Sequence, residues 1–273
     1  MTVFMKHMRM LGRFAPFLAL FAVAAVPLGA QMNVNPLDFE YVYPRIGADI
    51  GLSSVWQNGT YIAGCGRFET GAQINPLFAL AYDHPITNAI RFEALLGYQG
   101  RSVSSSYNSR ENVVLQTTNG AIPVDIDFEN IGNARFSYGF LLPSVKMYLA
   151  GKFFAGVGIS ANLLLSSSTQ YTKNILSKTV MLDDLKLSEV YYSEAESSDP
   201  YSKVFDEEQP DPVNGFGIDG VVYLGGEFEV SRGVMLVPRV LMTIPFSPVI
   251  PDPELKLMTL QFLIGARFNL YTQ

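Results

Sequence analysis

Apolar and polar side chains alternate at every second position in eight segments of this chain, and this alternation limits the possible folds more than any other feature. In "AIRFEALLGYQGR", residues 89–101, Phe92 and Leu96 fall on one set of alternate positions and Arg91 and Glu93 on the other. A period of two residues belongs to a strand whose faces meet different surroundings, whereas a helical period would mix these charges with apolar residues. The segment is therefore predicted to be a strand.

The connections between the alternating segments also follow a pattern, because short and long links take turns. The other seven segments are residues 45–54, 72–82, 136–147, 152–165, 215–229, 234–246 and 256–270. The short links are "DHPITN", "LAGK" and "VSRG", and the longer ones cover residues 55–70, 102–134, 167–214 and 247–254. An even number of antiparallel strands with short turns at one end and long loops at the other is typical of outer-membrane barrels.

One segment breaks the pattern. In residues 136–147 the predicted apolar face is formed by Phe136, Tyr138, Phe140 and Leu142. Pro143 follows, and since proline cannot donate to a strand ladder we predict a bulge or an edge-like irregularity there. Val145 and Met147 are then expected to take over the apolar face.

The first thirty residues have the features of a secretory signal peptide. Lys6, Arg9 and Arg13 precede "FAPFLALFAVAAVPL", and small residues at 28–30 offer a cleavage site. The alternative is a membrane anchor helix, but this apolar run of about 15 residues is shorter than the roughly 20 that a span needs. We predict a signal peptide over residues 1–30, a short periplasmic segment over 31–42 and a barrel domain over 43–273. Removing the signal takes the formal net charge from -6 to -9, which makes nucleic acid an unsuitable partner.

The composition of the polar face decides between a soluble and a membrane barrel. A soluble barrel would carry many Lys and Glu outside, whereas this face is rich in Gly, Ser, Asn and Gln with one or two charges per strand. Aromatic residues on the apolar face gather near both strand ends, as in the girdles of membrane barrels. They are Tyr82, Phe92, Phe153, Phe228 and Phe268 near the short turns and Tyr98, Phe136, Phe216 and Phe246 near the long loops. The predicted fold is all-β: an eight-stranded antiparallel transmembrane β-barrel of the outer membrane with long extracellular loops.

Charges on the polar face should then point into the lumen. The lumen of eight strands is just wide enough for side chains to fill, so we predict that acids and bases pair there and close it. A selectivity ring in a conducting channel is the alternative. The predicted ion-pair network consists of Asp49, Arg91, Glu93, Asp219, Glu227, Arg239 and Arg267, and Glu229 is expected beside it.

The stretch "YGFLLPSVKMYLAGKFFAGVGISANLLL", residues 138–165, combines an aromatic start, a Leu-Pro step, a lysine and a Gly-rich strand. In this pattern the chain resembles the small bacterial outer-membrane β-barrel domain proteins, the PorT-like and OmpA-like group, over residues 43–271. The resemblance implies the barrel fold. The 48-residue third loop departs from the family, so the secretion role of the namesake does not carry over.

Catalytic chemistry is almost absent from the sequence. His84 is the one histidine outside the signal, and it lies in a short turn on the periplasmic side, so the outer rim has no Ser-His or Asp-His pair. We predict that the chain is not an enzyme and needs no cofactor. Cys65 is alone and is interpreted as an inert loop thiol.

The third loop, residues 167–214, holds ten acids against four lysines. It is either a solvated loop or a site for a divalent cation or a partner, although its spacing matches no calcium loop. The acids in question are Asp183, Asp184, Asp206, Glu207, Glu208 and Asp211.

These patterns predict a monomer surrounded by outer-membrane lipid, with both mature termini in the periplasm and protein partners on the extracellular or periplasmic side. The expected function is a structural or surface-interaction role. The alternative is a small-solute channel or an accessory component of an outer-membrane secretion system.

Overall fold

The computed structural model describes residues 43–64, 66–117, 120–181, 187–192, 199–208, 212–231 and 233–270. Residues 42–273 cluster as one compact unit. The predictions for the signal peptide, for residues 31–42 and for Cys65 lie outside the described residues. In the part of the chain that the structure describes, no helix is long and apolar enough to cross a membrane.

The described residues form strands joined by turns and loops, so the all-β prediction is confirmed. The long strands are β1 (Arg45–Gly59), β4 (Ala72–Pro85), β5 (Ile90–Gly100), β6 (Val103–Thr117), β7 (Gly120–Ala150), β8 (Phe153–Ile175), β12 (Phe216–Gly226), β14 (Val234–Pro245) and β15 (Leu255–Asn269). The short ones are β2 (Tyr61–Ala63), β3 (Gly66–Phe68), β9 (Thr179–Met181), β10 (Leu187–Glu189), β11 (Ser202–Glu208) and β13 (Phe228–Ser231).

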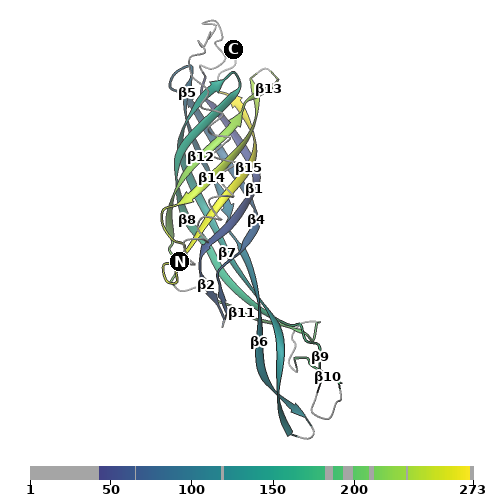
Figure 1. The fold of residues 1–273 in the computed structure, drawn as a ribbon. Coiled ribbons are helices and arrows are strands. Elements are labelled where there is room, and N and C mark those ends of the chain that lie inside the picture. Colours follow the sequence, from purple (N-terminus) through teal and green to yellow (C-terminus); the bar gives the residue numbers. More distant parts are fainter. Residues whose placement is uncertain are drawn as a thin grey trace, which may run out of the picture. The chain divides into compact units, whose positions relative to one another are not determined.

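The main sheet is antiparallel throughout. Its strands pair in the order β8-β12-β14-β15-β1-β4-β5-β7, and β7 pairs with β8 as well. Figure 1 shows these strands inclined side by side and wrapping around one axis. The sheet has eleven strands in the described residues, where the sequence predicted eight. The additional strands are β6 beside β7, β11 beside β8 and β13 beside β14.

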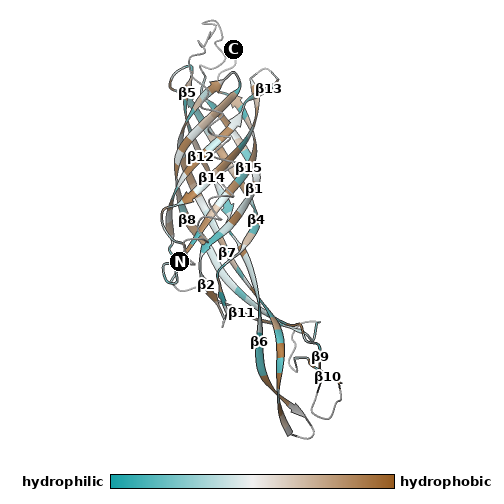
Figure 2. Ribbon diagram, viewed as in Figure 1, coloured by the Kyte–Doolittle hydropathy of each residue, from teal (hydrophilic) through white to brown (hydrophobic). Residues whose placement is uncertain are grey.

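Burial follows the two-residue alternation along most of these strands. In β1, Asp49 is 1% exposed and its neighbour Ile50 is 69% exposed. The buried positions define the inner face of the sheet, which carries the charged and polar residues together with apolar ones such as Leu95 and Leu263. The outer face is largely apolar, and Figure 2 shows the two kinds of residue alternating along the strands.

The aromatic residues of β7 lie on the opposite face from the one predicted. Phe136, Tyr138, Phe140 and Leu142 are buried on the inner face, whereas Leu141, Val145 and Met147 are exposed on the outer face. The inner face is itself apolar near the long loops, where Phe136 and Tyr138 join a buried cluster, and it also holds apolar residues farther along β7, where Leu142 lies opposite buried Leu95 of β5. Apolar character alone therefore does not identify the outer face at this end.

The predicted irregularity at Pro143 takes the form of a gap in the ladder with β8, which has no pair at Leu142 or Pro143, and no bulge forms there. Pro143 lies opposite Ala94 of β5 in an uninterrupted register. On the other side, the pairing with β8 passes from Leu141 to Ser144 without a shift. The register shift in this part of β7 comes earlier, between Ser137 and Tyr138. Proline is accommodated because the β8 pairing skips its position and needs no donor there.

Two segments predicted as loops, residues 102–134 and 167–214, contain strands. β6 and the first half of β7 form a long hairpin, and β8 and β11 continue the sheet beside it. We call residues 103–134 and 167–214 the arm. In the arm, Ile126, Phe128, Ile175, Val180 and Val190 form a small core of their own. These strands were not predicted because their polar composition shows no clear alternation of apolar and polar residues.

Candidate functional site: a buried ion-pair network

Four predicted residues form one closed group of charges on the inner face. Arg239 of β14 donates to Glu93 Oε2 of β5 at 2.5 Å and to Asp49 of β1. Arg267 of β15 donates to Asp49 Oδ1 at 2.7 Å and to Glu93 Oε1 at 3.0 Å. All four side chains are almost fully buried. Each arginine donates to both acids, so every charge in the group contacts two charges of opposite sign.

Gly265 of β15 makes room for this group. A Cβ atom at Gly265 would lie 1.8 Å from Asp49 Oδ1, far inside contact distance. Only glycine therefore lets the Asp49 carboxylate lie flat against the neighbouring strand and reach both arginines. The small residue at this position of the polar face therefore leaves space for a charged side chain from another strand.

A second group lies nearer the short turns and forms a chain of five charges. Arg45 Nη1 donates to Glu227 Oε2 at 2.7 Å, and Lys146 Nζ donates to Glu227 Oε1 at 2.7 Å. Lys146 also donates to Asp83 Oδ2 at 2.5 Å, and Arg91 Nε donates to Asp83 Oδ1 at 2.5 Å. Only Arg91 and Glu227 of this group were predicted.

The three missed residues differ in how far the sequence could reveal them. Arg45 lies on the same set of alternate positions as Asp49, so the sequence pattern already placed it on the polar face. Asp83 was assigned to a turn, although β4 continues to Pro85. Lys146 follows Pro143, where a change of face was expected that does not occur.

The third group lies toward the long loops. Arg101 donates to Asp219 Oδ2 at 2.5 Å, and Asn162 Nδ2 donates to the same oxygen at 3.0 Å. The Arg101 guanidinium also lies over the Tyr138 ring, 5.3 Å from its centre. Asp219 was predicted and Arg101 was not. Glu229, which was expected inside, is exposed, because β13 begins after Glu227 and its side chains are exposed on both faces.

These contacts join strands that are not neighbours in the sheet. Glu93 on β5 reaches Arg239 on β14, although β4, β1 and β15 lie between them in the pairing order. Among the described residues, eleven charged side chains are buried, six basic and five acidic. The interior is therefore crossed by side chains rather than left open.

A hairpin packs against the inner face of the sheet at the end of the long loops. The β2–β3 hairpin places Tyr61 and Phe68 in an apolar cluster, and the Tyr61 hydroxyl donates to the Gly132 carbonyl at 2.6 Å. Gln57 Nε2 donates to the Phe68 carbonyl at 2.7 Å. Burial raises the pKa of Tyr61 to about 12, so this donor stays protonated at neutral pH. Aliphatic and aromatic side chains from several strands complete the cluster.

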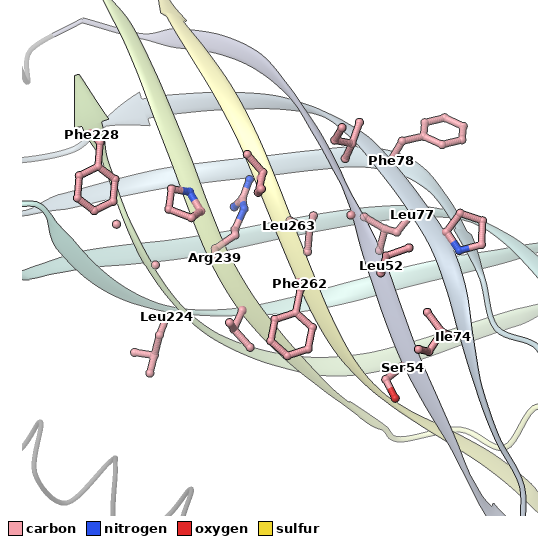
Figure 3. A pocket seen from close by; sticks show the side chains of 18 of the residues that line it. Leu52, Ser54, Ile74, Leu77, Phe78, Leu224, Phe228, Arg239, Phe262 and Leu263 are labelled. Atoms are coloured by element: carbon pink, nitrogen blue, oxygen red, sulfur yellow. The ribbon is translucent and has the colours of Figure 1, made fainter. Parts of the chain in front are cut away.

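The outer face has a shallow hollow without a polar centre. Figure 3 shows Leu52, Ile74, Phe78 and Phe262 among the side chains around it. Arg239 and Leu263 also border it, although their side chains are buried on the inner face. Nothing in this lining offers a convergent set of hydrogen-bonding groups, so the hollow is part of the apolar outer surface.

Metal-binding and catalytic groups do not assemble in the described residues. No three His, Cys, Asp or Glu side chains lie close enough there to hold a metal ion. His84 is exposed and contacts the Tyr82 hydroxyl through Nδ1 at 3.3 Å. The six loop acids named for a cation site have side chains outside the described residues.

Comparison with known proteins identifies no family. No family model matches the chain, and no curated protein matches it. Among solved structures, Ail of Yersinia pestis is 8% identical with a TM-score of 0.33 and covers 83% of this chain and 99% of its own. Neisserial surface protein A is 12% identical with a TM-score of 0.33, covering 83% and 97%. The outer membrane protease OmpT from Escherichia coli is 9% identical with a TM-score of 0.28, covering 86% and 99%. Such low scores carry no argument about function.

Proposed function

We propose that the chain is an outer-membrane β-barrel of a diderm bacterium whose lumen is closed by side chains and whose role is structural or surface-interacting. The observation that carries the proposal is the inversion of the two faces. Charged residues are buried inside, whereas apolar residues such as Ile50, Leu80 and Phe262 are exposed outside. In water this arrangement would leave a wide apolar surface uncovered, and lipid acyl chains are the medium that suits it.

The pairing order supports a barrel of eight strands. Each strand from β8 through to β7 pairs with the next, and the β7–β8 pairing joins the last strand to the first. Such closure leaves no unpaired edge in the bilayer, where an unpaired backbone group costs several kcal/mol. Arg45 lies opposite Asn269, so the two described ends of the chain lie together at the short-turn end. We assign that end to the periplasm and the arm to the outside.

Closure of the lumen argues against a channel. The ion-pair groups cross the interior at three levels, and the apolar cluster under the β2–β3 hairpin closes the loop end. A small-solute channel, or an accessory of a secretion system, would need these layers to move apart. We also propose that the role is non-enzymatic.

Two measurements test this proposal. Folded barrels resist sodium dodecyl sulfate until they are heated, so the purified protein should migrate differently on a gel before and after boiling. Recovery of a folded, detergent-free protein from the periplasm would contradict the barrel. In planar bilayers the protein should give no steady conductance, and large sustained openings would favour the channel instead.

A further inference from the structure

The net negative charge of residues 31–273 lies entirely in the arm. The arm segments hold five Lys and Arg against fourteen Asp and Glu, whereas the rest of residues 31–273 holds eleven of each. The arm therefore carries -9 and the remainder is neutral. Such an excess attracts cationic surfaces and repels both a second acidic arm and an anionic lipid surface.

An exposed apolar patch lies on this acidic arm. β9 and β10 form a small hairpin in which Leu187 lies directly opposite Met181. On one face of the hairpin, Val180 is buried in the small core of the arm. On the other face, Met181 and Leu187 are 63% and 72% exposed. Tyr191, two positions beyond β10, is 61% exposed, and the exposed polar pair of Glu189 and Thr179 lies between it and Leu187 along the hairpin. Figure 1 shows the hairpin beside the far end of β6, away from β12, β14 and β15.

We propose that Met181, Leu187 and Tyr191 form the centre of a docking surface for a protein that offers an apolar hollow bordered by Lys and Arg. Apolar and aromatic anchors inside a polar rim are the usual anatomy of a protein interface, and methionine adapts readily to a partner's shape. This inference deepens the proposed surface-interaction role and rests on the arm lying outside the bilayer.

Charge separates this partner from the other possible occupants. A lipid surface could bury the same three side chains, but anionic headgroups would face an arm of -9. A second copy of the chain would bring two such arms together, which like charges oppose. A basic protein surface satisfies both the apolar patch and the charge.

The test is a selection from a phage-displayed library of small domains with a randomised surface, using the full chain in neutral detergent micelles as bait. Selected domains should carry apolar residues together with Lys and Arg, and their binding should weaken at high salt. They should bind a Met181→Ser/Leu187→Ser variant at least about tenfold more weakly, because truncating interface anchors typically costs this much. An Ile62→Ser variant should bind as the wild type does, since Ile62 is an exposed residue of the β2–β3 hairpin outside the patch.

Three outcomes would overturn the inference: domains that bind both the wild type and the double variant equally, patch-dependent binding to phosphatidylglycerol vesicles, and a patch-dependent dimer in detergent. Boiling-dependent gel migration of the same preparations tests the barrel separately. A folded barrel without patch-dependent binding would refute the docking surface and leave the proposed function standing.

Discussion

The interior of the sheet and the arm both hold acid–base pairs, but the two regions use them in different surroundings. The side chains of Arg239 and Asp49 are fully buried, whereas those of Arg110 and Asp125 in the arm are 67% and 52% exposed and lie 3.6 Å apart. An exposed pair contributes little because water solvates each charge well by itself. A buried pair cannot lose one member without leaving the other unsolvated. The same chemistry is therefore essential inside and nearly dispensable outside.

The largest expected effect is the loss of one interior charge. Arg239→Ala should lower the free energy of unfolding by about 3 to 5 kcal/mol, because Asp49 and Glu93 would then share Arg267 alone. Urea unfolding in detergent micelles or vesicles measures this. Phe262→Ala, on the outer face, should cost far less, since Phe262 is 54% exposed and would exchange one apolar contact for another.

A second substitution separates charge imbalance from lost packing. In the Arg239→Ala background, Glu93→Gln removes one of the two acids and should recover part of the lost stability. If Arg239→Ala unfolds at the wild-type urea concentration, or if Glu93→Gln makes it worse, the interior is wet enough to screen its charges and the contrast with the arm disappears.

The next prediction compares the substitution of two adjacent phenylalanines, which lie on opposite faces of β8. Phe154 is 1% exposed and packs edge-on against Tyr148 and Tyr223, whereas Phe153 is 59% exposed. Phe154→Ala should cost about 3 to 5 kcal/mol because it leaves a cavity in a packed interior. Phe153→Ala should cost much less in micelles. Equal losses would mean that both faces of this strand are packed, contrary to the proposed membrane barrel.

The alternation of side chains predicted most of the strands in the sheet. It worked for the parts of β1 and β15 away from the long loops, where Asp49 and Arg267 face in and Ile50 and Phe268 face out, because the inner face there is charged or polar at most positions. It failed at Phe136 because the interior changes from charged to apolar near the loops. The arm strands escaped detection since water covers much of their surface and imposes little pattern.

The candidate site shows the same division. The alternation brought Asp49, Glu93, Arg239 and Arg267 onto one face, and the structure pairs all four. It could not show which acid meets which base, because that depends on the register between distant strands and on how the sheet curves. Lys146 was missed for a local reason, since β7 passes Pro143 without changing faces.

A smaller effect is expected for Arg110 of the arm. Arg110→Ala should change the free energy of unfolding by less than about 1 kcal/mol, because its contacts with Asp125 and Asp127 are long and exposed. Any loss should shrink as salt is added. Chemical unfolding at low and high salt measures both. A loss as large as that of Arg239→Ala would show that the arm is as dry as the interior.

The smallest expected effect is a pH dependence of the arm. Lys173 Nζ lies 2.6 Å from Glu111 Oε2, and this hydrogen bond holds the pKa of Glu111 below its usual value. Since the folded pKa is below the unfolded one, the stabilisation is complete above the unfolded pKa and is lost as pH falls through the folded pKa. Glu111 is partly exposed, so solvent screening keeps the contribution small. Carboxyl carbon NMR should show a lower titration midpoint for Glu111 in the wild type than in Lys173→Gln. Identical midpoints would show that the Lys173–Glu111 pair does not persist in solution. The arm would then lack even weak ion pairing, whereas the interior depends on ion pairs.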